Sequence, residues 1–364
     1  MNKKKLLFIF GTRPEFIKVY PVILEAKKQG NEVVIVNTGQ HKEMLDSLLE
    51  YFDLTVDYNL AVMNQVNGLT EILTVTLTGL NEIIGKERPD LVLVHGDTSA
   101  TLAGSIAAFY NQVKLAHIEA GLRTYNKYSP FPEEVNRQLT GVIADYHFAP
   151  TTTAQNHLLQ EGKPAADVFV VGNSAIDMLQ YTLKEDYQHP ILTQLEGKKL
   201  ILITAHRREN LEALTGIFRA INRLAIEHGE TCEFVYPIHM NPVIREKARQ
   251  YLTAANIKIV DPLNTIDFHN IMNYAHLILT DSGGIQEEAP ALGIPVLVLR
   301  DTTERPEGVE AGTLKLVGTD EEKIVLGVNE LLGNQTLYNQ MKQVKNPYGD
   351  GTTSQQIMGI INHG

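Results

Sequence analysis

Residues 6–24 read LLFIFGTRPEFIKVYPVIL. Five apolar residues without alternation, followed by a glycine, favour a strand that is buried on both faces, as in a parallel sheet. The residues after the glycine place Phe16, Tyr20 and Ile23 on one face of a helix. A buried strand that leads directly into such a helix is the first half of a βαβ unit, and we therefore expect an α/β fold.

The same alternation of apolar runs and helical stretches continues along the chain. The expected strands of the first half are 6–10, 33–36, 91–94, 113–118, 145–149 and 168–171, and those of the second half are 199–204, 233–237, 257–260, 276–280 and 295–299. This pattern predicts two Rossmann-like doubly wound domains facing a cleft, with ligands at the carboxyl ends of the strands. We expect the first domain to span 1–172 and the second 173–351.

The composition restricts the class of protein. Hydrophobic residues make up 43% of 364 residues, which is enough to bury a core in two domains. A net charge of −11 disfavours partners such as nucleic acid or an anionic membrane surface. The single cysteine, Cys232, excludes an intrachain disulfide. No apolar run approaches the roughly 18 residues of a membrane span, so we expect a cytoplasmic protein.

A candidate anion site follows the first strand. Gly11 permits a tight turn, the next helix begins there, and Arg13 and Lys18 supply positive charge. The segment matches neither the Walker A loop nor the dinucleotide fingerprint. An ordinary strand-to-helix turn with a proline near the helix start is an equally good interpretation.

Carboxylates follow the next two expected strands. Asp97 comes after the strand at 91–94, Glu119 comes after the strand at 113–118, and the pair Glu133-Glu134 follows a proline-rich loop. Taken alone, Asp97 is best explained as the N-cap of the helix expected over 99–110. Three carboxylate positions at one sheet edge repel one another unless a cation, a proton or a ligand offsets them.

In the second half, charged and glycine-rich segments again follow strands. His206 lies beside Arg207 and Arg208, which favours a neutral ring or a bound anion, although a solvated charged loop is the alternative. The strongest motif is the helix start at Ser282, Gly283 and Gly284, where bare amides can approach a diphosphate.

Three further side chains are candidates on the same side of the second domain. Glu288 lies one helical turn after the glycines, within reach of a ribose diol. Arg305 follows the next strand, and Phe268 lies in the expected loop after Pro262, where an aromatic ring can stack on a base. Core packing is the safer interpretation of Phe268. The 12 histidines show no metal-ligand spacing, so we expect no metal.

Seven ordered motifs together resemble the bacterial non-hydrolysing UDP-N-acetylglucosamine 2-epimerases. The motifs are Gly-Thr-Arg-Pro-Glu at 11–15, His-Gly-Asp-Thr at 95–98, Glu-Ala-Gly-Leu-Arg-Thr at 119–124, Phe-Pro-Glu-Glu at 131–134, His-Arg-Arg-Glu-Asn at 206–210, Ser-Gly-Gly-Ile-Gln-Glu-Glu at 282–288 and Arg-Asp-Thr-Thr-Glu-Arg-Pro at 300–306. The resemblance implies the glycosyltransferase-B-like fold, a homodimer, no cofactor, and a final helix over about 352–364 that returns to the first domain.

The resemblance also implies a reaction and roles. UDP-GlcNAc would be converted reversibly to UDP-ManNAc by elimination of UDP to 2-acetamidoglucal and re-addition, supplying ManNAc units for cell-surface polysaccharide. The acid and base candidates are Asp97, Glu119 and Glu133, with His206 at the leaving oxygen. The UDP-binding candidates are Arg13, Lys18, Phe268, Ser282, Gly283, Gly284, Glu288 and Arg305.

One segment departs from the family's pattern. Some members bind a second UDP-GlcNAc as an activator, and Gln40, His41 and Arg207 are candidates for such a site. The stretch 61–72 contains no Lys or Arg, however, and Val66 stands where a basic residue is expected. We therefore do not expect this activation in its familiar form.

Three other functions fit parts of the same pattern. A hydrolysing epimerase that releases ManNAc and UDP would share the fold and the carboxylates. A retaining glycosyltransferase would need an acceptor groove that the sequence does not indicate. A non-catalytic sugar-nucleotide sensor would not need the acid candidates, which are all present.

Overall fold

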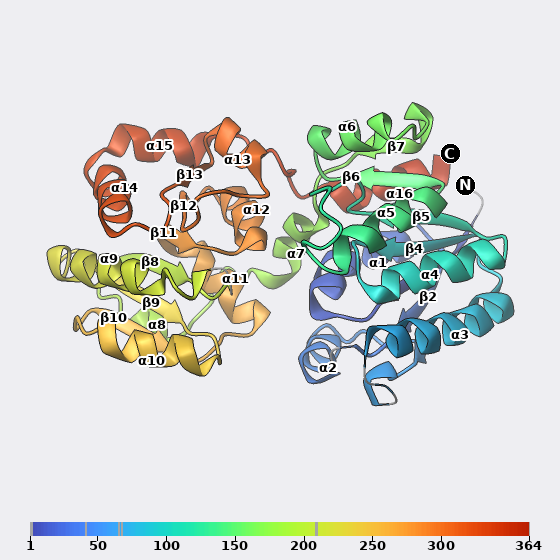
Figure 1. The fold of residues 1–364 in the computed structure, drawn as a ribbon, viewed down its shortest axis with the longest axis horizontal. Helices are drawn as coiled ribbons and strands as arrows, with labels where there is room; N and C mark the ends of the chain where they lie inside the picture. Colours follow the sequence, from blue (N-terminus) through green and yellow to red (C-terminus); the bar gives the residue numbers. More distant parts are fainter. Residues whose placement is uncertain (1–2, 41, 65, 67, 208–209, 364) are drawn as a thin grey trace. The chain divides into compact units, whose positions relative to one another are not determined.

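The computed structural model describes residues 3–40, 42–64, 66, 68–207 and 210–363. The chain divides into two compact units (Figure 1). Unit 1 is Met1–Met178 with Tyr348–Gly364, and unit 2 is Leu179–Pro347. From the sequence we expected the limits after residues 172 and 351. Helix α7 (Ser174–Thr182) contains the first of the observed limits.

Unit 1 is a parallel sheet with helices on both faces. In the part of the chain that the structure describes, its seven strands run in the order β3-β2-β1-β4-β5-β6-β7. The strands are β1 (Lys5–Phe10), β2 (Glu32–Asn37), β3 (Tyr58–Asn59), β4 (Leu91–His95), β5 (Lys114–Ile118), β6 (Tyr146–Ala149) and β7 (Val168–Val170). The helices are α1 (Arg13–Lys28), α2 (Lys42–Tyr51), η1 (Val62–Asn64), α3 (Leu69–Glu87), α4 (Ser99–Tyr110), α5 (Glu133–Ile143), α6 (Thr152–Gln160), η2 (Ala165–Asp167) and α16 (Thr353–His363).

Unit 2 repeats this architecture. Its sheet, over the described residues, has six parallel strands in the order β10-β9-β8-β11-β12-β13. The strands are β8 (Lys199–Thr204), β9 (Cys232–Pro237), β10 (Ile257–Val260), β11 (Ala275–Thr280), β12 (Val296–Val298) and β13 (Leu314–Leu316). The helices are α8 (Pro190–Thr193), α9 (Leu214–Glu227), α10 (Pro242–Tyr251), α11 (Thr265–Asn273), α12 (Gly283–Ala291), α13 (Pro306–Ala311), α14 (Glu321–Gly333) and α15 (Gln335–Gln343).

The predicted doubly wound α/β architecture is confirmed in both units. Each strand order reverses once, at the neighbours β1 and β4 in unit 1 and at β8 and β11 in unit 2. In open parallel sheets, the crevice at such a reversal lies outside the carboxyl ends of the strands and is the usual ligand site. The segments that follow these four strands and their neighbours are therefore the candidate ligand sites.

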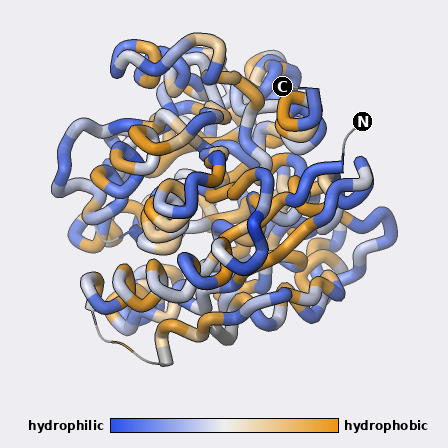
Figure 2. The backbone as a smooth tube through the Cα atoms, turned by 90° about the vertical axis from the view of Figure 1, so that its right-hand side faces the viewer, coloured by the Kyte–Doolittle hydropathy of each residue, from blue (hydrophilic) through white to orange (hydrophobic). Residues whose placement is uncertain are grey.

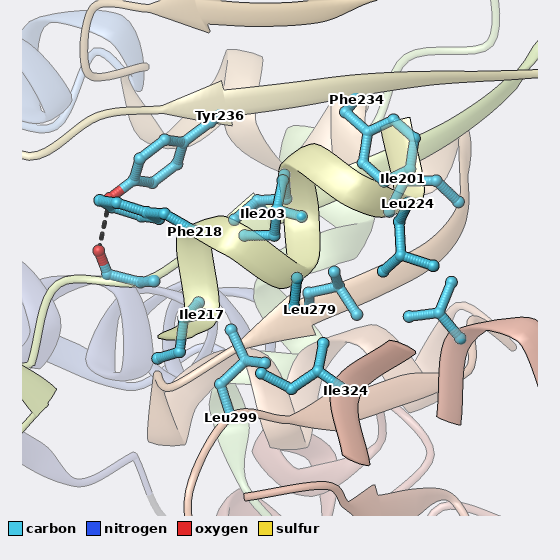
Figure 3. Packing of buried hydrophobic residues seen from close by; sticks show 14 of the residues in the cluster. Ile201, Ile203, Ile217, Phe218, Leu224, Phe234, Tyr236, Leu279, Leu299 and Ile324 are labelled. Carbon is cyan, nitrogen blue, oxygen red and sulfur yellow. Dashed lines mark hydrogen bonds between the residues drawn. The ribbon is translucent and has the colours of Figure 1, made fainter. Parts of the chain in front are cut away.

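The apolar runs lie on both faces of each sheet, as their lack of alternation predicted. In β1, Phe8 packs in one buried cluster while Ile9 packs in another on the opposite face. In β8, Ile201 and Leu202 divide in the same way. Orange hydrophobic stretches alternate with blue hydrophilic ones along the tube in Figure 2. Figure 3 shows one cluster of unit 2, where the Tyr236 hydroxyl donates to the carbonyl oxygen of Ala205 at 2.5 Å.

The C-terminal helix α16 belongs to unit 1 through a buried cap. Ile357, Met358 and Ile361 of α16 pack in a core cluster of that unit. The carboxylate of Asp177 accepts hydrogen bonds from the amides of Thr353 (3.2 Å) and Ser354 (2.7 Å). Helix amides at an N-terminus need such an acceptor, so Asp177 holds the start of α16 in place.

None of the helices in the described ranges has the length and apolar character that a membrane crossing requires.

Candidate functional site

Two of the three acid and base candidates of unit 1, Asp97 and Glu119, lie close together at the carboxyl ends of β4 and β5. Glu119 follows β5 directly and is 8% exposed, with a φ of 62°. This left-handed backbone is rare for a residue with a side chain, and such strain is characteristic of functional sites. The turn directs the Glu119 carboxylate towards the residues that follow β4.

Two cations meet the Glu119 carboxylate. Lys18 of α1 forms an ion pair with Oε1, and Arg137 of α5 lies 3.2 Å from Oε2. Burial acts to raise the pKa of Glu119, but Lys18, His95 and Arg137 outweigh it and hold that pKa well below its usual range. The carboxylate is therefore ionised, and the repulsion expected between carboxylates is offset by cations.

Arg137 joins the two carboxylates. Its guanidinium also forms an ion pair with Asp97, whose side chain is 26% exposed. The prediction that Asp97 caps α4 is wrong, because Thr98 is the N-cap and its hydroxyl accepts from the amide of Thr101. The side chain of Asp97 is therefore directed to Arg137 rather than to a helix end. The sequence did not single out Arg137, because its role depends on two distant strands.

His95 completes this cluster. It is 4% exposed, and Nε2 lies 3.9 Å from Oε1 of Glu119. Burial lowers the pKa of His95 to about 4, so the ring is neutral near pH 7.

Glu15 is a buried residue that sequence reasoning did not select. Its carboxylate accepts from the amides of Gly11 (3.0 Å) and Thr12 (2.8 Å), and from the Thr98 hydroxyl (2.6 Å). It thereby ties the turn after β1 to the turn that carries Asp97. The Thr-x-x-Glu spacing of a capping box was the signal available in the sequence. Arg13 is the first residue of α1, next to this turn.

The pair Glu133-Glu134 separates into two roles. Glu134 is buried and accepts from the amides of Thr124 (2.9 Å) and Tyr125 (3.1 Å), which fixes the preceding loop. Glu133 is the first residue of α5 and partly exposed. The Glu133 side chain makes no hydrogen bond or ion pair to the described residues, so the structure does not join it to Asp97 and Glu119.

Two of the three allosteric candidates, Gln40 and Arg207, lie within the described residues. The Oε1 atom of Gln40 is 3.2 Å from where a Cβ on Gly11 would be, at the ends of β1 and β2. His41 lies outside the described residues. Arg207 belongs to unit 2, where Nη1 lies 3.4 Å from Glu304.

In unit 2, a buried aspartate organises the segment after β8. Asp281 is completely buried, and its Oδ2 accepts from the amides of His206 (2.9 Å) and Arg207 (2.8 Å). The His206 ring stacks on His239 with centroids 5.5 Å apart. Burial, His239 and Arg207 lower the pKa of His206 against the opposing effect of Asp281, which favours the neutral ring. Asp281 was not among the candidates selected from the sequence.

Two guanidinium groups lie at the start of α12. A Cβ at Gly283 would lie 3.4 Å from Nη2 of Arg207 and 3.7 Å from Nη2 of Arg305. Ser282 occupies the N-cap position, and its side chain makes no capping hydrogen bond to the described residues. Helix amides, a glycine without a side chain and two guanidinium groups together suit an anion. Arg305 also forms an ion pair with Glu287.

Glu288 lies over the first turn of α12, and Phe268 lies elsewhere than expected. A Cβ at Gly284 would be 3.8 Å from Oε1 of Glu288. Phe268 is in helix α11 rather than in a loop, because Asn264 caps the helix by accepting from the amide of Asp267. Its ring packs partly buried against a core cluster of unit 2.

No group of three or more His, Cys, Asp or Glu side chains in the described residues is placed to hold a metal ion.

Two doubly wound parallel-sheet units, each with charged side chains after the strands at its reversal, define a glycosyltransferase-B-like protein. A family model for UDP-N-acetylglucosamine 2-epimerase matches residues 24–362. The chain belongs to this family.

Individual relatives agree with this assignment. The UDP-N-acetylglucosamine 2-epimerase of Bacillus subtilis is 53% identical over 361 residues, covering 98% of this chain and 95% of the relative. A crystal structure from Listeria monocytogenes is similar with a TM-score of 0.94 and 50% identity, covering 99% of this chain and 96% of the other. The Neisseria meningitidis UDP-GlcNAc 2-epimerase, solved with UDP-GlcNAc bound, has a TM-score of 0.88 and 45% identity, covering 99% and 100%.

Proposed function

We propose that this chain converts UDP-GlcNAc reversibly to UDP-ManNAc without hydrolysis, for use in cell-surface polysaccharide. Membership of the epimerase family supports the reaction, and the Neisseria meningitidis relative bound to UDP-GlcNAc supports the ligand. The observation that carries the proposal is the cluster of Asp97, Arg137 and Glu119, because it holds two carboxylates in reach of a common cation.

The chemistry explains why carboxylates and anion-binding groups are both required. The hydrogen on carbon 2 is not acidic, since no carbonyl carbon is adjacent to carbon 2 in the ring. As the bond from carbon 1 to UDP breaks, positive charge develops and a base can remove that proton. The electron pair forms the double bond of 2-acetamidoglucal. UDP then adds back to carbon 1 while an acid protonates the opposite face of carbon 2.

We assign the proton transfers to unit 1 and most of the nucleotide contacts to unit 2. Asp97, Glu119 and Glu133 are the acid and base candidates, and His206 assists at the leaving oxygen. The guanidinium groups of Arg207 and Arg305 beside Gly283 support binding of the diphosphate there. The remaining nucleotide contacts that we propose are Arg13, Lys18, Phe268, Ser282, Gly284 and Glu288.

Proton NMR of UDP-GlcNAc with the purified protein in heavy water tests this function. A mixture of the two epimers with deuterium at carbon 2 is the expected result. Release of free sugar would instead indicate a hydrolysing epimerase. Unchanged substrate would indicate a binding protein, and transfer only in the presence of an added acceptor would indicate a glycosyltransferase.

We also propose that the chain is a homodimer, which the family resemblance supports. Light scattering of the purified protein should then give twice the 40.6 kDa of the chain. A mass equal to one chain at micromolar concentration would contradict the dimer.

A further inference from the structure

A buried polar contact joins helices α11 and α12 behind the proposed ribose contact. Nε2 of His269 lies 3.5 Å from Oε2 of Glu288. His269 is 3% exposed and the side chain of Glu288 is 14% exposed. The distance is long for a full hydrogen bond, but the low polarity of the surroundings strengthens the attraction between the ring and the carboxylate.

The second ring nitrogen has a partner that sets the proton position. Nδ1 of His269 lies 2.9 Å from the hydroxyl of Thr182. Because the Glu288 carboxylate can only accept a hydrogen bond, the proton of a neutral ring lies on Nε2, and the Thr182 hydroxyl donates to Nδ1. An N–H group therefore faces Glu288, and a protonated ring would face it in the same way.

The two oxygens of Glu288 have different surroundings. Oε2 faces His269, whereas Oε1 lies over the first turn of α12, 3.8 Å from a Cβ position on Gly284. Holding one oxygen of a carboxylate leaves the other in a defined place for a ligand, as supporting residues do in metal and catalytic sites.

We propose that His269, oriented by Thr182, is a positioning residue. It holds the Glu288 carboxylate in place to accept a hydrogen bond from a ribose hydroxyl of the nucleotide. This inference rests on the proposed function, in which Glu288 binds the ribose. His269 touches neither the sugar nor the diphosphate in this scheme, so it acts on nucleotide affinity and leaves the proton transfers unchanged.

Two amide variants distinguish the contact of Nε2 with Glu288 from the contact of Nδ1 with Thr182. In His269→Gln the amide can reach the place of Nε2 and still contact Glu288. In His269→Asn the amide reaches only the place of Nδ1, beside Thr182. Dissociation constants for UDP and 2′,3′-dideoxyUDP are measured by calorimetry for each variant, with KM and kcat for UDP-GlcNAc. Melting by circular dichroism confirms that both variants fold.

The ratio of the two dissociation constants is the decisive quantity. The wild-type protein should prefer UDP by roughly tenfold or more, the worth of a charge-assisted hydrogen bond. His269→Asn should lose most of this preference and raise KM with little change in kcat, whereas His269→Gln should keep it. Thr182→Val should reduce the preference in the same direction, and it carries the test if His269→Asn does not fold.

A purely structural role gives a different result. If His269→Asn weakens both nucleotides equally, or leaves the ratio unchanged, His269 does not position Glu288. If the wild-type protein binds both nucleotides equally, the ribose role of Glu288 fails and this inference with it, while UDP binding stands. If the wild-type protein binds neither nucleotide, the proposed function itself is wrong.

Discussion

Individual residues at the sheet edge of unit 1 owe their charge states to one another. Glu119 is buried, and a buried carboxylate is ordinarily protonated more easily than one in water. Lys18 and Arg137 reverse that tendency through direct contact. Glu119 is thus ionised because the fold places two cations beside it, and each cation can be removed separately.

Replacing Arg137 with glutamine should disturb Asp97 and Glu119 together. Without the shared cation the two carboxylates repel each other, so the pKa of Glu119 rises and protonation occurs at higher pH. Turnover of UDP-GlcNAc should fall by about 10² or more, and the acidic limb of the pH–rate profile should move to higher pH. In the control Arg223→Gln, which removes an exposed pair with Glu322, neither quantity should change. An unshifted acidic limb in Arg137→Gln would show that Arg137 does not set the charge of Glu119.

Replacing Gly283 with alanine tests the anion site at the start of α12. The added methyl group would meet two guanidinium groups at ordinary contact distances of 3.4 and 3.7 Å, so the fold should tolerate it. The methyl would occupy the space that faces those groups, and the affinity for UDP should fall about tenfold or more. Calorimetry measures this loss.

Gly333→Ala is the matched control, since a Cβ there meets nothing within 4 Å. Its UDP affinity should equal that of the wild-type protein. Equal affinity in Gly283→Ala as well would remove the start of α12 from the nucleotide site.

The sequence predicted those site residues whose positions depend on neighbouring residues in the chain. Asp97 and Glu119 were placed correctly after their strands, because a buried apolar run identifies a strand end. The competing explanation of Asp97 as a cap failed because the adjacent Thr98 satisfies the helix instead. Arg137 was not selected, since its partners follow β4 and β5 and only the folded sheet brings them together.

At the scale of helices and strands, continuous apolar runs identified the long buried strands in both units. The short strands β3 (Tyr58–Asn59) and β13 (Leu314–Leu316) were not predicted, because neither contains a continuous apolar run. Phe268 was assigned to a loop because the cap at Asn264 was not recognised.

Helix α16 should depend on its cap from Asp177. Replacement of Asp177 by alanine leaves the buried amides of Thr353 and Ser354 without an acceptor. Such a loss typically costs about 1–3 kcal/mol in free energy of unfolding, measured by urea denaturation, and the α16 amides should exchange faster with heavy water. Asp320→Ala removes an exposed cap from α14 and should cost less. Equal losses in the two variants would contradict a special role for the buried cap.

A buried histidine on strand β6, His147, should make the stability of the protein fall in acid. His147 lies opposite His117 in the register, and burial lowers the pKa of His147 from 6.5 to about 4. The unfolded chain therefore binds a proton that the folded chain does not between about pH 6.5 and 4, and stability falls as the pH falls through this range. His147 alone contributes at most about 1.4 kcal/mol per pH unit.

His147→Gln removes this contribution. The free energy of unfolding, followed by urea denaturation between pH 6.5 and 4.5, should decline less steeply with acid than in the wild-type protein. The same slope in both proteins would show that His147 is not buried in its neutral form.

On the scale of the whole molecule, a negative net charge coexists with two arginines at one helix start. The chain carries a net charge of −11, yet the helix start in unit 2 lies beside Arg207 and Arg305. Global acidity disfavours polyanions such as nucleic acid, whereas a small cationic site still suits one diphosphate. The sequence revealed both features, but the pairing of the arginines with Gly283 required the folded unit.

Under the proposed division of labour, unit 1 supplies the proton transfers and unit 2 supplies most of the nucleotide contacts. The most direct test compares Asp97→Asn with the wild-type protein in two assays, UDP affinity by calorimetry and epimer formation by NMR. We predict unchanged UDP affinity with turnover reduced on the order of 10²–10⁴-fold. Near-normal turnover in Asp97→Asn, or a loss of UDP affinity as large as the loss of turnover, would contradict this division.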